Sequence, residues 1–149
     1  MIGIQELDGE IVCSYGDILV LQDNSYYSIL GDYKSGYVLN GPFKLDKVKS
    51  SNQNETYLYT DLKLVDNGVC VLAGETSYGG AGFIALKTHD NSDFLWLLHL
   101  SNMNNPKRLR LKDNVIRLTT DLVYPEGVDF HIPVSNPQHF NTSLSDGNW

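Results

Sequence analysis

The side chains of this sequence that could do chemistry gather in its last third, where charged residues and a histidine alternate with apolar ones. They are Arg108, Arg110, Arg117, Asp121, Asp129 and His131. Alternate residues of a strand point to the same side, so this spacing puts all six on one face of neighbouring strands. An aspartate with a histidine can transfer protons in a cleft, and an arginine can bind a carboxylate through two parallel hydrogen bonds. Exposed sheet faces are seldom clefts, so the pattern favours a partner-binding face over a catalytic site.

Two of these arginines are expected to face each other. A two-residue turn at Asp113-Asn114 places Arg110 opposite Arg117, and it puts two apolar pairs on the other face, Leu111 with Ile116 and Leu109 with Leu118. Like charges opposed across a strand pair are unfavourable. We expect relief from Asp121 or Asp129, from solvent, or from a partner's carboxylate or a bound anion. The simpler alternative is a solvated face with internal salt bridges.

No other part of the sequence has the spacing of a known catalytic or metal site. The four histidines and two cysteines lack metal-ligand spacing, and there is no nucleophile elbow, P-loop or HExxH motif. His99 lies in an apolar run and is expected in the core, as are the thiols of Cys13 and Cys70. The glycines between residues 79 and 82 are expected to allow a bulge or close packing before Phe83, and a ligand-cradling loop is the alternative. We therefore predict no catalytic residue, no metal and no cofactor.

Antiparallel strands are predicted to carry these side chains. Apolar residues alternate around Asp-Asn turns that begin at residues 23, 66 and 113. Predicted hairpins cover residues 18–30, 62–72, 82–100 and 109–118. The longest apolar run, 94–100, is predicted to be a central strand with Trp96 in the core, and two turns of buried helix are the alternative. No segment has a sustained helical period, so we predict an all-β antiparallel sandwich or partly open barrel of about ten strands.

The length of 149 residues suits one domain with its own core. We place a single all-β domain at residues 1–134. Residues 128–132 alternate like a half-exposed strand, which we expect near a sheet edge because prolines follow it. The polar composition of residues 135–149 predicts a loosely held C-terminal tail, whose final Trp149 is a candidate anchor for a partner and completes the candidate binding face.

The formal net charge of −7 argues against a nucleic-acid partner, because phosphate binding needs a basic surface. It favours encounter with a basic partner, although it also serves solubility. The first ten residues do not have the basic and apolar regions of a signal peptide, and no apolar run reaches transmembrane length. We therefore expect a cytoplasmic protein without a membrane partner.

Three short segments resemble a family. They are GAGFIAL at residues 80–86, FLWLL at 94–98, and the run from Ser101-Asn102 to Asn105-Pro106. This arrangement is similar to that of small β-rich bacterial immunity proteins, which neutralise a neighbouring toxin. Such proteins share no diagnostic motif, and Lys107 stands where an aromatic residue is expected after Asn-Pro, so no functional residue is carried over. The resemblance implies a cytosolic protein that binds its target without catalysis.

Three function classes remain open. The first is a non-catalytic immunity protein that binds and occludes a basic toxin domain. The second is a small-ligand or carbohydrate-binding module on a β-sandwich, suggested by nine tyrosines and clusters such as Tyr26-Tyr27. The third is a hydrolase-like enzyme that uses Asp121 or Asp129 with His131.

Overall fold

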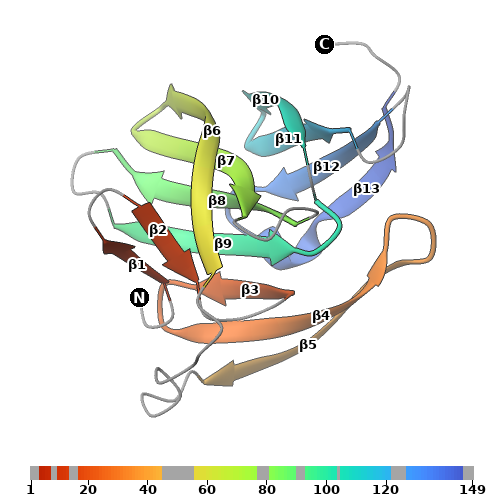
Figure 1. Cartoon of the computed structure of the whole chain (residues 1–149), viewed down its shortest axis with the longest axis horizontal. Coiled ribbons are helices and arrows are strands. Elements are labelled where there is room, and N and C mark those ends of the chain that lie inside the picture. The colour runs from red at the N-terminus through yellow and green to blue at the C-terminus, as the bar shows by residue number, and fades with distance from the viewer. Residues whose placement is uncertain are drawn as a thin grey trace.

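The computed structural model describes residues 4–7, 10–13, 17–44, 56–76, 81–89, 93–103, 105–121 and 127–145, with backbone alone for 4–7, 10–13, 56 and 57. Strands form nearly all of these ranges (Figure 1), so the all-β prediction is confirmed. The strands are β1 (Ile4–Leu7), β2 (Glu10–Cys13), β3 (Ile18–Leu21), β4 (Ser25–Asp32), β5 (Gly36–Lys44), β6 (Thr56–Asp66), β7 (Val69–Thr76), β8 (Gly82–Thr88), β9 (Phe94–Leu100), β10 (Pro106–Lys112), β11 (Val115–Thr120), β12 (Val128–Pro133) and β13 (Asn141–Leu144). The described ranges hold one short 3₁₀ turn, η2 (Pro137–His139), and no helix long and apolar enough to cross a membrane.

The strands form two antiparallel sheets. The large sheet has nine strands in the order β1-β2-β6-β7-β8-β9-β3-β4-β5, and the small sheet has four in the order β10-β11-β12-β13. All four predicted hairpins are present, as β3–β4, β6–β7, β8–β9 and β10–β11. The register predicted for the last hairpin is also confirmed, since Leu111 faces Ile116 and Leu109 faces Leu118.

Each Asp-Asn turn uses a left-handed backbone conformation. Asn24, Asn67, Asp113 and Asn114 all have φ between 50° and 66°. Asn and Asp tolerate this conformation better than other side chains do, because their short polar groups can hydrogen-bond to the local backbone. The turn chemistry therefore fixes where each hairpin reverses and, through it, which residues reach each face.

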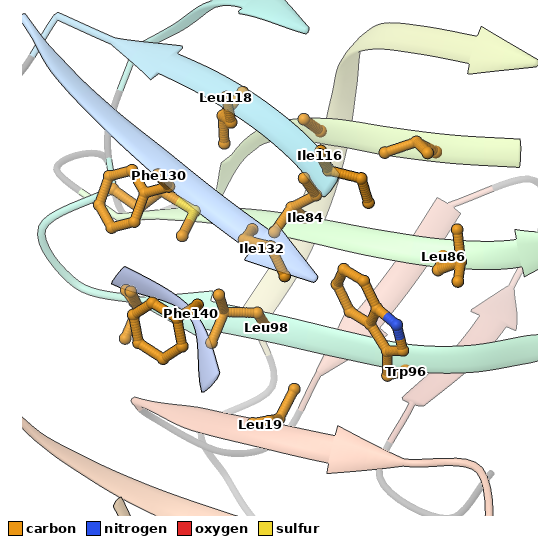
Figure 2. Close-up of a cluster of buried hydrophobic side chains, with 14 of the residues drawn as sticks. Leu19, Ile84, Leu86, Trp96, Leu98, Ile116, Leu118, Phe130, Ile132 and Phe140 are labelled. Atoms are coloured by element: carbon orange, nitrogen blue, oxygen red, sulfur yellow. The ribbon is translucent and has the colours of Figure 1, made fainter. Parts of the chain in front are cut away.

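The main core lies between the two sheets (Figure 2). Leu19, Ile84, Leu86 and Leu98 of the large sheet belong to one buried cluster with four residues of the small sheet, which are Ile116, Leu118, Phe130 and Ile132. Trp96, on β9, is 3% exposed and belongs to the same cluster, as its position in the most apolar run predicts. This packing of two sheet faces is that of a β-sandwich.

Part of the opposite face of the large sheet is also buried. Ile18, Val20, Phe83 and Leu97 form a second cluster, which Leu58 of β6 joins. The register of β6 shifts between Thr60 and Leu62, and such a bulge bends a strand. Figure 1 shows β6 crossing in front of β7, β8 and β9. The bend thus lets the first part of β6 pack over the opposite face of β8 and β9 in the same sheet.

Two predicted core residues lie on this second side. Cys70 belongs to the second cluster, and His99, on β9, is buried. These expectations are confirmed. The side chain of Cys13 lies outside the described residues.

The prediction of a loosely held tail after residue 134 is wrong for the described part of that segment. η2 and β13 follow β12, and Phe140 between them enters the main core. Because β13 pairs with β12, β12 lies one strand in from the edge of the small sheet. The polar composition of this segment did not indicate that Phe140 packs into the core or that four residues of β13 pair with β12. Trp149 lies outside the described residues.

Two of the segments that carry the family resemblance meet in space. A side chain at Gly82 would place its Cβ 1.7 Å from the carbonyl oxygen of Met103, so only glycine allows this approach. Met103 is fully buried in the main core. The expectation of close packing at this glycine is confirmed, and the contact holds the start of the connection between the two sheets.

Candidate functional site

The outer face of the small sheet carries the predicted site residues. Its side chains alternate with those of the core, and the strand register arranges them in rows across the sheet. One row runs through Arg110, Arg117, His131 and Asn141, and the next runs through Arg108, Thr119, Asp129 and Ser143. The predicted opposition of Arg110 and Arg117 is therefore confirmed. We call this surface the outer face.

Arg117 is held in place by a buried carboxylate. Its Nη2 lies 2.8 Å from Oδ2 of Asp129, and its Nε donates to the same oxygen at 2.9 Å. The hydroxyl of Thr119 donates to the other oxygen, Oδ1. The side chain of Asp129 is 2% exposed and that of Arg117 is 21% exposed. The sequence pattern placed Asp129 on the correct face but suggested an exposed group, whereas the arginine and its neighbours cover it.

Asp121 has a different partner. Its Oδ1 lies 3.1 Å from Nζ of Lys107, and these side chains are 28% and 55% exposed. An ion pair this exposed contributes little stability. Of the two aspartates expected to relieve the arginines, Asp129 does so for Arg117, and Asp121 contacts a lysine at the end of the sheet.

An open hollow of about 400 Å³ lies above the first row. It is lined by Arg110, Lys112, Asp113, Val115, Arg117 and His131. Among the described residues, no carboxylate lies within ion-pair distance of Arg110, which is partly buried. The hollow therefore has more cationic than anionic groups in its wall.

His131 contacts a serine on the neighbouring strand. Its Nε2 lies 2.9 Å from Oγ of Ser143 in an exposed position. Hydrolases use such a pair when a third group orients the imidazole. In the described part of the chain, His131 makes no hydrogen bond to Asp121 or Asp129, whose contacts are with Lys107 and with Arg117 and Thr119. These three residues are brought to one sheet without forming a connected catalytic group.

A second hollow, which the sequence did not indicate, lies between the tip of the β4–β5 hairpin and β13. It has a volume of about 440 Å³, and Tyr33, Tyr37 and Phe140 line it together with polar residues. The hydroxyl of Tyr37 donates to Oδ1 of Asn102 at 2.9 Å, and its ring centre lies 5.2 Å from that of Phe140. Burial raises the pKa of Tyr37 to about 12, although the hydrogen bond to Asn102 opposes this shift. The only sequence signal was two tyrosines flanking a Lys-Ser-Gly turn.

Within the described residues, no three histidine, cysteine, aspartate or glutamate side chains come close enough to hold a metal ion.

Comparisons with known proteins yield limited similarity. No protein family and no solved structure matches the chain. The chain is similar to the glycyl-glycine endopeptidase ALE-1 of Staphylococcus capitis, with 33% identity over 86 residues. The alignment covers 56% of this chain and 24% of the endopeptidase, so the matched region is about a quarter of that protein.

Proposed function

We propose that this chain is a non-catalytic, cytoplasmic binding protein of the immunity type, which occludes a toxin domain through its outer face. The observation that carries the proposal is the pair Arg110 and Arg117, which face each other on an open sheet surface while Asp129 fixes the second of them. Arginines on an accessible face, one of them held in place by a carboxylate, suit the recognition of another protein. The resemblance of the segments around Gly82 and Trp96 to immunity proteins supports the same function.

Charge distribution supports a partner that is basic overall. The chain carries a net charge of −7, which accelerates encounter with a cationic protein. Its arginines are clustered, because all three lie between residues 108 and 117. The overall charge would thus attract the toxin, and the arginines would fix its orientation through an acidic group at the point of contact.

Co-expression with the product of the adjacent gene tests this function. If that product is toxic, the wild-type chain should restore growth and co-purify with it. Arg110→Glu should abolish both effects, because it reverses the charge of one of the two opposed arginines, on the edge strand β10 of the outer face. Lys63→Glu is the matched control, since Lys63 is exposed on β6 of the large sheet. A neighbour that is harmless, or equal binding by both variants, would refute this function or its assignment to the outer face.

A second candidate is a small-ligand-binding module, favoured by the aromatic hollow around Tyr33, Tyr37 and Phe140. Aromatic walls with a few polar groups are typical of ligand sites. The similar endopeptidase is named for glycyl-glycine bonds, so short glycine peptides are the first ligands to test, followed by a glycan panel. A saturable change in tyrosine fluorescence that Tyr33→Ala removes would favour this candidate. No response to either panel would exclude these ligands.

A further inference from the structure

The opposed arginines of the outer face differ in how their charge is balanced. Arg117 directs Nε and Nη2 to the Oδ2 atom of Asp129, and Thr119 holds the other oxygen of this carboxylate. Arg110 lies opposite on β10, and none of the described carboxylates is within ion-pair distance of it. The sheet therefore places two arginines opposite each other in the wall of one hollow and supplies a buried anion for one of them.

From this arrangement we propose that Arg110 and Arg117 form a receptor for a single carboxylate, presented by an aspartate or glutamate side chain of a protein partner. The inference rests on the proposed function and names the group recognised at that face. A carboxylate between the two arginines would relieve their repulsion and accept charge-assisted hydrogen bonds. The hollow of about 400 Å³ above them leaves room for an acidic side chain.

The local charge favours a carboxylate over a phosphate group. Asp113 lines the same hollow, and Asp129 lies against Arg117, so the two anionic groups offset part of the positive charge. Lys112 lines the hollow as well, so three cationic groups face two anionic ones, and this balance suits a ligand with one negative charge. The net charge of −7 also opposes the approach of a polyanion such as a nucleic acid. A protein that is basic overall and carries one acidic group at the contact meets neither obstacle.

The receptor is also organised before binding. The carboxylate of Asp129 is 2% exposed and fixes the guanidinium of Arg117, so this side chain has little freedom left to lose when a ligand binds. Arg110 has no such anchor. We therefore expect Arg117 to set the position of the ligand and Arg110 to close on it.

The three arginines of the chain make a direct test practicable. Their Nε–H groups give three side-chain resonances in a ¹⁵N-labelled sample, which single Arg→Lys variants assign. The probe is the blocked tripeptide acetyl-Gly-Glu-Gly-amide, with acetyl-Gly-Gln-Gly-amide as the uncharged control and inorganic phosphate as a third ligand. The glutamate peptide should shift the Arg110 and Arg117 resonances in a saturable way, and Arg110→Gln should weaken its binding about tenfold. Lys63→Gln is the control on the large sheet and should leave the titration unchanged.

Several results would overturn the receptor. Equal shifts with the glutamine peptide would show that no carboxylate is recognised, and tighter binding of phosphate would show a general anion site. Arg110→Lys guards against misfolding, since it keeps the charge and should retain part of the affinity while losing the paired hydrogen bonds. If Arg110→Glu abolishes toxin binding while the glutamate peptide shifts nothing, the proposed function stands and the receptor is refuted. If the peptide binds and no toxin does, the receptor stands and the immunity function is refuted.

Discussion

The indole nitrogen of Trp96 donates a hydrogen bond of 2.9 Å to the carbonyl oxygen of Val134, and this bond joins the two layers of the sandwich. Trp96 belongs to β9 of the large sheet, and Val134 follows β12 of the small sheet. A buried tryptophan usually has a partner for its N–H group, because an unpaired donor in the core is costly. The same side chain thus fills the main core and fixes one end of the small sheet.

Removal of Trp96 should therefore cost more than apolar burial alone. Trp96→Ala should lower the free energy of unfolding by about 3–5 kcal/mol, the cost typical of deleting a large aromatic side chain from a core. Trp96→Phe should cost less, because it keeps most of the apolar contact and loses the hydrogen bond to Val134. Urea unfolding of the three proteins measures both effects. Equal stability of Trp96→Ala and the wild type would contradict the packing of β9.

The ion pair of Arg117 and Asp129 should be costly to break from one side. Arg117→Ala leaves a carboxylate that is 2% exposed without its cation, so unfolding free energy should fall by about 3–5 kcal/mol. The double variant Arg117→Met with Asp129→Leu should recover most of this loss, since no buried charge remains. The control is Lys107→Ala, which breaks an exposed pair and should cost less than about 1 kcal/mol. Equal effects of the two alanine variants would show that Asp129 is hydrated.

The turn between β10 and β11 offers a test of backbone conformation. Asn114 has φ of 60° and Asp113 has φ of 53°, as the type I′ turn requires. Asn114→Ala should destabilise the protein by about 1 kcal/mol, because alanine tolerates this conformation poorly. Asn114→Gly should raise stability, since glycine is the favoured residue at the second position of this turn. Thermal unfolding of both variants checks the sign, and destabilisation by glycine would contradict the turn type.

Tyr37 should make stability depend on pH under alkaline conditions. Burial raises its pKa to about 12 in the folded state, whereas the unfolded value is about 10. A group whose pKa is higher in the folded state contributes its full stability below the unfolded pKa and loses it as pH rises toward the folded pKa. Stability should therefore fall between pH 10 and 12, and less steeply in Tyr37→Phe. Parallel curves for the two proteins would contradict the burial of this hydroxyl.

The local parts of the fold could be predicted from the sequence. Alternating apolar residues and Asp-Asn turns determine a hairpin through residues close together in the chain. The register around Asp113-Asn114 could therefore be predicted from that stretch alone. The order of the strands could not be predicted in this way. Nothing in the local pattern of β3 indicates that it lies between β4 and β9. The strand β13 was missed because its four residues, Asn141 to Leu144, are mostly polar and three of them are exposed.

The candidate site was predicted in part, for the same reason. The opposition of Arg110 and Arg117 follows from hairpin register, which is local. The burial of Asp129 depends on Arg117, Thr119 and the arrival of β13 beside β12, none of which alternation alone can indicate. The aromatic hollow around Tyr37 joins segments about a hundred residues apart in the chain, so local sequence patterns could not indicate it.

The position of β3 in the large sheet also constrains the order of folding. β3 and β4 can pair as soon as both are synthesised, but the other edge of β3 pairs with β9, whose residues come much later in the chain. Leu19 and Val20 therefore gain their final neighbours Leu98 and Leu97 only after most of the chain has left the ribosome. Contacts between such distant segments slow folding, because a long loop has to close before any of them forms. The β3–β4 hairpin should thus depend on β9 for its stability during synthesis.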